Sequence, residues 1–178
     1  FTDADYAAKG NLIKWNPAVK TAADRDALRA GLLDGSVDVV ATDHAPHTLE
    51  EKERPYANAP SGGPLVQHSL PMMLELSAQG VLPVETVVEK MCHAPARLFG
   101  VRDRGFLRTS HFADIVLVRP ADPWTVSKEN ILYKCGWSPL EGTAFSHRVV
   151  RTLVNGRTVY ADGRVDTAHR GAELEFDR

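Results

Sequence analysis

The sequence has 178 residues, of which 43% are hydrophobic and 25% charged, a composition that suits one globular core with or without a small appended unit. The formal net charge of -2 gives no broad basic surface, which argues against a nucleic-acid partner. No apolar run approaches the roughly 20 residues that cross a bilayer, no secretory signal opens the chain, and two cysteines are too few for a disulfide scaffold, so we expect a cytoplasmic protein without membrane contacts.

The chain begins with Phe1 rather than Met, and residues 1–15 do not resemble the start of a domain. This pattern predicts part of a longer protein. A complete protein that has been shortened by processing is the alternative.

A helix and a strand are predicted between residues 16 and 47. Thr21 is a suitable N-cap, and Asp24 stands three positions later, where a capping box has its acid. The apolar positions that follow at helical spacing are Leu28, Leu32 and Leu33, before a closing Asp34-Gly35 turn. Residues 37–42 (VDVVAT) are β-branched and mostly apolar, which is typical of a buried strand in a parallel sheet. A helix followed by such a strand forms half of a repeating α/β unit.

A long polar loop and two helices come next. Residues 47–64 are rich in Pro, Gly and Glu, and loops of this length in compact domains are often functional. Apolar spacing predicts a helix over 66–79 and a second over roughly 83–98, which Gly100 stops. The expected buried face of the second helix consists of Val87, Val88, Met91 and Leu98.

After Gly100 the pattern changes from helical to β. Strands are predicted over 113–118, 148–154 and 158–160. Asn155-Gly156 lies between the last two, and Asn-Gly between β-prone runs is the strongest short hairpin signal. Asp162-Gly163 repeats the device, so the last third of the chain is predicted to be a small β unit.

The sharpest chemical feature is Asp43-His44-Ala45-Pro46-His47, which follows the predicted strand at 37–42. In barrels of alternating strands and helices, catalytic groups lie at the carboxy-terminal ends of the strands. An aspartate there can ligate a divalent metal with one oxygen and accept a proton with the other. His47 can donate a hydrogen bond to an anionic substrate. The alternative is that Asp43 only caps the next segment and that both histidines are surface residues.

These residues resemble the last-strand signature of dihydroorotases in the amidohydrolase superfamily. The preceding stretch, with Lys14-Trp15-Asn16-Pro17, Asp24-Arg25 and Asp34-Gly35, is similar to the same region of those enzymes. Residues 133–142 (YKCGWSPLEG) resemble their late signature in a small β domain. The three matches stand in the family's order and cover most of the chain.

The resemblance implies an α/β fold: residues 1–100 would form the last strand and flanking helices of a TIM-type (β/α)8 metal-dependent hydrolase barrel. Residues 101–178 would form a small β-sandwich-type domain. The parent enzyme would reversibly hydrolyse the cyclic amide of dihydroorotate to N-carbamoyl-aspartate in pyrimidine biosynthesis, with one or two Zn²⁺ ions. We expect a small-molecule substrate, the remainder of the barrel as a partner, and a homo-oligomer.

The family's site residues carry over by position. Asp43 matches the metal-liganding aspartate that acts as general base and returns its proton to the leaving nitrogen. His47 matches a histidine that contacts the substrate carboxylate, and Asn16 matches an asparagine that hydrogen-bonds the ring. Ser61 and Gly62 align with a backbone pair that touches substrate, although the family usually has an aromatic residue where Ser61 stands. From its residues alone, Asn16 is equally a turn residue before Pro17.

The remaining histidines and the missing ligands limit this reading. His44, His68 and His93 are expected to have structural roles. No His-x-His pair occurs in the sequence, and one aspartate cannot replace the roughly three protein ligands of a catalytic zinc. Most ligands are therefore expected upstream, and this chain alone is expected to be inactive. Two alternatives stay open: another cyclic amidohydrolase, such as a dihydropyrimidinase or allantoinase, and a non-catalytic structural subunit with the same fold.

Overall fold

The helix predicted after Thr21 is present in the computed structural model, which describes residues 1–177. Helix α2 (Ala22–Asp34) begins with the predicted capping box, in which Thr21 and Asp24 each accept the other's backbone N–H. It ends at Gly35, whose φ of 88° is left-handed. Of its three leucines, Leu32 packs against the core, while Leu28 and Leu33 are 63% and 53% exposed. The helix was therefore predicted correctly from the spacing of these leucines, although two of the three lie at the surface of the described residues.

The next predicted helices are also present, with interruptions. The first begins as a 3₁₀ turn (Val66–His68) and continues as α4 (Ser69–Ala78). The second is divided into α5 (Val84–Val88), a π-helical turn (Glu89–His93) and α6 (Ala94–Phe99). The extra residue in the π turn shifts the helical phase, and Val88 and Leu98 are 41% and 58% exposed, so their predicted burial was wrong. Helices α4 and α5 contribute to a core made of Met73, Leu74, Leu82 and Val87.

The last third is a four-stranded antiparallel sheet in the order β1-β2-β3-β4. The strands are β1 (Ile115–Thr125), β2 (Ala144–Val154), β3 (Arg157–Ala161) and β4 (Arg164–Val165). Both predicted hairpin turns are confirmed: φ is 51° and 76° at Asn155-Gly156, and 47° and 84° at Asp162-Gly163. Positive φ at both turn residues matches the right-handed twist of the flanking strands.

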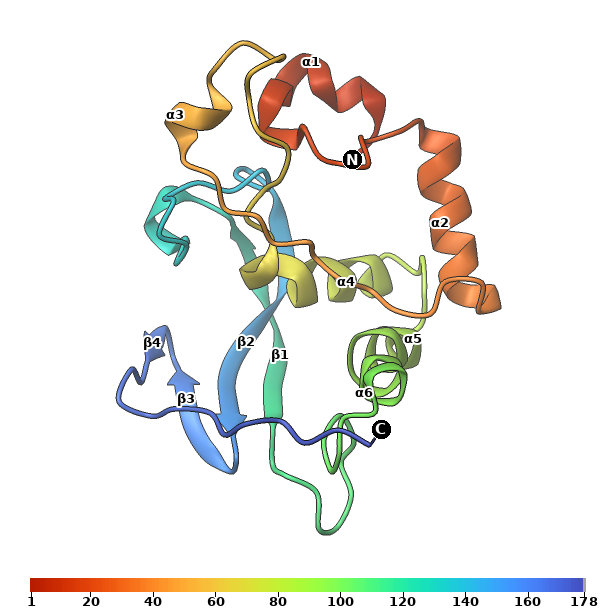
Figure 1. The fold of residues 1–178 in the computed structure, drawn as a ribbon, viewed down its shortest axis with the longest axis vertical. Helices are drawn as coiled ribbons and strands as arrows, with labels where there is room; N and C mark the ends of the chain where they lie inside the picture. The colour runs from red at the N-terminus through yellow and green to blue at the C-terminus, as the bar shows by residue number, and fades with distance from the viewer. Residues whose placement is uncertain (178) are drawn as a thin grey trace.

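Helix α4 packs against the sheet, and Figure 1 shows it between the sheet and helices α2, α5 and α6. The contact includes a polar anchor, because the Glu75 carboxylate accepts the backbone N–H and the hydroxyl of Ser146, at 2.8 and 2.7 Å. Residues 1–177 form one sheet with helix α4 packed on it, so the sandwich-type domain stays a prediction. The division of the chain at residue 100 stays a prediction.

The segment predicted as a buried parallel strand, residues 37–42, forms no strand in the structure. Its backbone bonds to a helix instead: Val40 N–H donates to the carbonyl of Lys90 at 3.0 Å, and Lys90 Nζ donates to the carbonyl of Val37 at 2.5 Å. One parallel bridge, between His44 and Gly63, follows it. A parallel strand needs a neighbouring strand for its N–H and C=O groups, and residues 1–177 offer only this single bridge. The barrel therefore stays a prediction.

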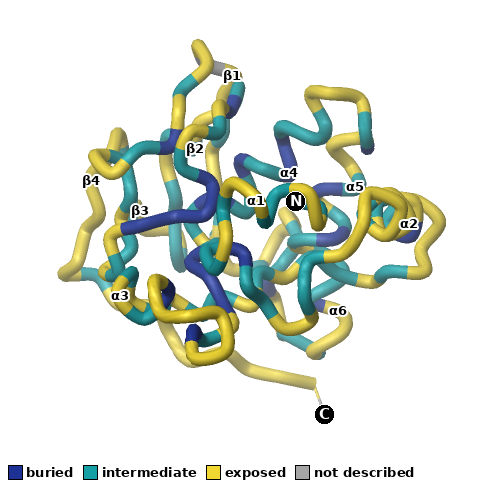
Figure 2. Tube along the Cα trace, turned by 90° about the horizontal axis from the view of Figure 1, so that it is seen from above, coloured by how far each residue is buried: buried dark blue, intermediate teal, exposed yellow. Residues whose placement is uncertain are grey.

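The N-terminal and C-terminal segments lie at opposite ends of the molecule (Figure 1). Helices α1 (Tyr6–Lys9) and α3 (Leu49–Lys52) lie at the same end of the molecule (Figure 1). At the other end the C-terminal segment returns to α6, where Asp177 N–H donates to the carbonyl of Gly100 at 2.8 Å. Figure 2 shows that much of α2 and most of this tail are exposed, while the buried residues concentrate between the helices and the sheet.

Candidate active site

Asp43 is exposed, and its backbone has a φ of 45°. Aspartate is among the few non-glycine residues that adopt this left-handed conformation, which is often found at functional sites. In the part of the chain that the structure describes, its carboxylate makes no hydrogen bond or ion pair. Both carboxylate oxygens of Asp43 are therefore free to bind a group that does not belong to residues 1–177.

His44 has the structural role that was predicted for it. Its Nδ1 accepts the backbone N–H groups of Leu65 and Val66, at 3.1 and 3.3 Å. Its ring lies 5.3 Å from the ring of Tyr133, centroid to centroid. These contacts hold the residue next to Asp43 against the start of α4 and against the late motif.

Gly62 and Gly63 bring the three predicted site segments together. Ala45 N–H donates to the carbonyl of Gly63 at 3.2 Å, and Gly62 N–H donates to the carbonyl of Lys14 at 2.9 Å. At Gly62, where φ is 126°, an added Cβ would lie 2.6 Å from the Cβ of Ala45 and 3.3 Å from Cδ2 of His47. Only glycine permits this approach without displacement of the neighbours.

Asn16 and Ser61 are exposed, and their side chains make no hydrogen bond among residues 1–177. Asn16 follows Trp15, whose indole nitrogen lies 2.8 Å from the position of a Cβ on Gly63. The structure thus places the predicted residues Asn16, His47, Ser61 and Gly62 on adjoining segments. Their contacts with a substrate stay predictions.

His47 connects this region to the late motif. Its Nδ1 lies 3.5 Å from Oε2 of Glu51, and its carbonyl accepts the indole N–H of the buried Trp137 at 2.8 Å. Glu51 also accepts the N–H of Thr48, a hydrogen bond that is the main cause of its lowered pKa. The late motif was predicted as a family signature, but its direct contact with His47 was not.

A buried polar cluster is centred on the fully buried His68, and its member Tyr133 also contacts the ring of His44. The Nδ1 of His68 lies 3.3 Å from the hydroxyl of Tyr133 and 3.4 Å from Oγ of Ser138. Burial lowers the pKa of His68 to about 4 and raises that of Tyr133 to about 12, so both are neutral at pH 7. The expected structural role of His68 is confirmed. The sequence held no signal for its partners, which are 65 and 70 residues away.

His93 also has the predicted structural role. Its ring stacks on Phe106, with centroids 4.5 Å apart and planes 7° from parallel, and its Nδ1 lies 3.4 Å from Oε2 of Glu89.

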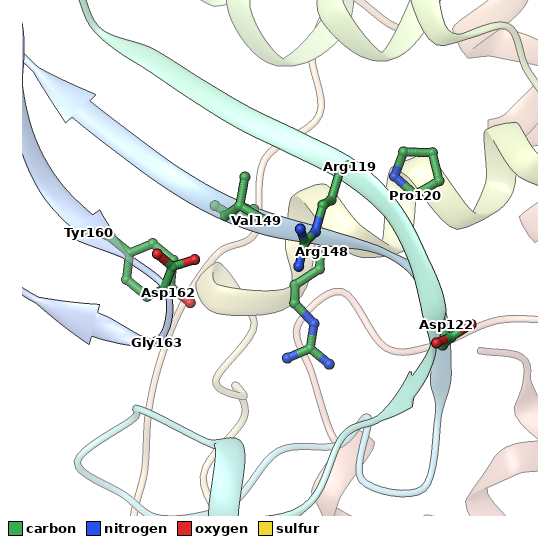
Figure 3. Close-up of a pocket in the computed structure, with 9 residues that line it drawn as sticks. Arg119, Pro120, Asp122, Arg148, Val149, Tyr160, Asp162 and Gly163 are labelled. Atoms are coloured by element: carbon green, nitrogen blue, oxygen red, sulfur yellow. The ribbon is translucent and has the colours of Figure 1, made fainter.

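A hollow of about 620 Å³ lies on the sheet. Figure 3 shows its lining side chains, which include Arg119 from β1, Arg148 from β2, Tyr160 from β3 and Asp162 from the turn after β3. It contains none of the predicted site residues. Its charges are mixed and it is open to solvent, so the cluster around Gly62 is the stronger candidate for the active site.

The described residues do not form a complete metal site. They contain no group of three or more His, Cys, Asp or Glu side chains arranged to hold a metal ion. A catalytic zinc takes about three protein ligands. The exposed, unpartnered Asp43 fits as one oxygen ligand, and the other ligands would have to come from outside residues 1–177. Within these residues the structure also has no helix that is both long and apolar enough to span a bilayer.

The chain is similar to known proteins in sequence and in fold. A dihydroorotase from Pelobacter propionicus is 41% identical over 162 residues, which cover 90% of this chain and 38% of that protein. A dihydroorotase from Trichlorobacter lovleyi is 38% identical over 163 residues, with the same two shares. The structure of an L-hydantoinase (dihydropyrimidinase) from Arthrobacter aurescens superposes with a TM-score of 0.87 at 31% identity, covering 94% of this chain and 38% of that one. The chain therefore spans about 38% of the length of these relatives. The model of the amidohydrolase family matches residues 8–159, and the chain belongs to this family.

Proposed function

We propose that the protein containing this chain is a dihydroorotase, which reversibly hydrolyses the cyclic amide of dihydroorotate to N-carbamoyl-aspartate in pyrimidine biosynthesis. The observation that carries the proposal is the packing of the Asp43–His47 segment against Gly62 and Gly63, which also contact the segment before Asn16. The similarity to dihydroorotases over 90% of the chain supports it.

Asp43 is the proposed general base. Its carboxylate is exposed and has no partner in the described structure. It can therefore accept a proton from the water that attacks the ring carbonyl. It then returns the proton to the nitrogen that leaves when the ring opens. The reverse reaction uses the same group in the opposite order, which explains reversibility with one carboxylate.

His47, Asn16, Ser61 and Gly62 are the proposed substrate contacts. His47 lies beside Gly62 and can donate to the substrate carboxylate. The N–H of Gly62 is already bonded to the Lys14 carbonyl, and its carbonyl accepts Lys52 Nζ at 2.8 Å, so a contact from Gly62 would be a van der Waals contact of its Cα. The N–H of Ser61 has no acceptor among residues 1–177, which makes it the better donor of the pair.

One or two Zn²⁺ ions are the proposed cofactor, and Asp43 would supply one ligand. Bound zinc would supply Lewis-acid polarisation of the ring carbonyl and of the attacking water. We also propose that the rest of a (β/α)8 barrel completes the site around residues 1–100, with residues 101–178 as a small β domain. The cytoplasmic location and the homo-oligomeric state stay predictions.

A hydantoinase or dihydropyrimidinase is the second candidate, favoured by the superposition on the Arthrobacter enzyme. His47 argues against it, as it would against an allantoinase, because a hydrogen-bond donor at this position suits a substrate carboxylate that those substrates lack there. A non-catalytic subunit of the same fold is the third candidate. A structural role does not explain why Asp43, Asn16 and His47 occur together.

The test is an assay of the full-length protein with N-carbamoyl-aspartate, dihydroorotate, dihydrouracil, hydantoin and allantoin, together with metal analysis. A dihydroorotase converts the first two and contains zinc. Turnover of dihydrouracil, hydantoin or allantoin in preference to dihydroorotate would replace the proposal with the second candidate. A protein with neither metal nor turnover would be a non-catalytic subunit.

A further inference from the structure

Lys52, the last residue of α3, is only 1% exposed although it carries an amino group. Lysine is almost never fully buried unless its charge is paired. Here the partners are three backbone carbonyls: Nζ donates to Gly62 at 2.8 Å, to Pro60 at 2.9 Å and to Lys14 at 3.2 Å. All three donor positions of the ammonium group are therefore used.

These three carbonyls belong to the two segments that flank the proposed substrate site. Lys14 precedes Asn16 by two positions, and Pro60 and Gly62 flank Ser61. Since Gly62 N–H also donates to the carbonyl of Lys14, the Lys52 amino group closes a ring of hydrogen bonds. The relative position of Asn16 and Ser61 thus depends on Lys52, which reaches neither of them directly.

The rest of the loop at 47–64 is held in the same way. Lys14 Nζ donates to the carbonyls of Tyr56 and Ala59, at 2.5 and 2.6 Å. Asn11 Nδ2 donates to the carbonyls of Lys52 and Arg54, at 2.9 and 2.7 Å. A long loop without an apolar core of its own is therefore ordered by side-chain nitrogen atoms on backbone carbonyls.

Lys52 also leaves positive charge beside Gly62, and Lys14 adds a second positive charge at the carbonyls of Tyr56 and Ala59. Within residues 1–177, no carboxylate oxygen lies within 4.0 Å of either amino group. Burial, and then the charge of Lys14, lower the pKa of Lys52 to about 8, so the group is still mainly protonated at pH 7. Backbone carbonyls carry no net charge, so they hold the ammonium groups without neutralising them. An anionic substrate group bound at Ser61, whose N–H has no acceptor among residues 1–177, would complete the balance.

We propose that Lys52 is a positioning residue, which fixes the segments of Asn16 and of Ser61-Gly62 and leaves a positive charge beside Ser61-Gly62 that favours an anionic substrate group there. This inference rests on the proposed function and names the feature that selects a substrate with a carboxylate. Lys52 acts through the loop backbone and does not touch the substrate itself.

The test uses the full-length protein with Lys52→Met, which removes the donors and the charge, and Lys52→Gln, which keeps two N–H donors without the charge. Lys20→Met is the matched control, because Lys20 is exposed and its amino group makes no hydrogen bond in the described structure. Melting temperature, bound metal, and kcat and KM for dihydroorotate are measured for each variant.

We expect KM for dihydroorotate to rise about tenfold or more in Lys52→Met, the size of effect that loss of hydrogen bonds from a charged group produces. We expect kcat to stay within about threefold, since binding rather than proton transfer is affected. Bound metal should not change, Lys52→Gln should be intermediate, and Lys20→Met should match the wild type.

Folded Lys52 variants with an unchanged KM would overturn the proposal. Variants that lose metal and kcat in parallel at constant KM would also overturn it. Loss of the cooperative melting transition in both Lys52 variants would do the same, because either result assigns Lys52 to general stability. If the wild-type protein does not turn over dihydroorotate, the proposed function itself fails. If the wild type is active and the folded Lys52 variants keep its KM, only the role proposed for Lys52 fails.

Discussion

Trp137 donates its indole N–H to the carbonyl oxygen of His47 at 2.8 Å across 90 residues of sequence. Trp137 is buried, and it belongs to the late motif next to the sheet, whereas His47 opens the loop of the candidate site. The bond fixes the backbone at the point where the chain leaves Asp43 and enters α3. It therefore couples the β unit to the geometry of the site.

Replacing Trp137 by Phe should lower the free energy of unfolding by about 1–3 kcal/mol, because the partly buried carbonyl of His47 loses its donor and the smaller ring leaves space. KM for dihydroorotate should rise as well, because His47 is less well held. Thermal melting and steady-state kinetics on the full-length protein measure both effects.

Trp124→Phe is the control for Trp137→Phe. Trp124 donates to the carbonyl of His147 at 2.8 Å, a bond of the same type that lies within the sheet. This variant should melt at a lower temperature at unchanged KM. Equal KM values for the two tryptophan variants would show that the bond to His47 has no part in substrate binding.

Asp43→Asn should reduce kcat by about 10²–10⁴-fold, the contribution typical of a general base. The melting temperature of metal-free protein should not change, because the carboxylate has no partner within residues 1–177. Asp38→Asn, an exposed aspartate five positions earlier, is the matched control and should keep full activity. A fully active Asp43→Asn enzyme would remove the proposed mechanism.

Gly62→Ala should destabilise the protein by about 1–3 kcal/mol and raise KM, since the new Cβ would lie 2.6 Å from the Cβ of Ala45 at a positive φ. Gly136→Ala separates the two causes, because Gly136 has a φ of 72° but no atom within 4 Å of the added Cβ. It should show the backbone cost without the effect on KM. The double variant Gly62→Ala with Ala45→Gly should recover part of the loss, and no recovery would locate the defect elsewhere.

His68 should make the protein less stable in acid. Its folded-state pKa of about 4 lies below the usual 6.5, because burial disfavours the charged ring among Tyr133, Ser138, Trp124 and Phe145. The unfolded chain therefore binds more protons between pH 6.5 and 4, and the free energy of unfolding falls as the pH falls through this range. The full loss corresponds to roughly 3 kcal/mol.

Urea unfolding of the wild type and of His68→Gln at pH 7, 5.5 and 4.5 measures this effect. The variant has no titrating ring, so its stability should decline less between pH 7 and 4.5. Parallel pH profiles for the two proteins would show that His68 does not carry the acid sensitivity.

Local signals in the sequence were sufficient for much of the fold. The capping box at Thr21 and Asp24, the stop at Gly35 and the turns at Asn155-Gly156 and Asp162-Gly163 were all predicted correctly. Each depends on a hydrogen bond or a backbone conformation within a few residues, so neighbouring side chains determine it. The Asp43–His47 motif was likewise recognisable from adjacent residues.

Other features depend on residues that are distant in sequence. Residues 37–42 have strand propensity but form no strand, because residues 1–177 offer them no neighbouring strand and their backbone groups bond to Lys90 instead. The burial of Lys52 among carbonyls, the partners of His68 and the bond from Trp137 to His47 have no local signature. Propensity describes the conformation that one segment favours by itself. Burial and long-range hydrogen bonds depend on which distant segments meet, and only the tertiary structure decides that.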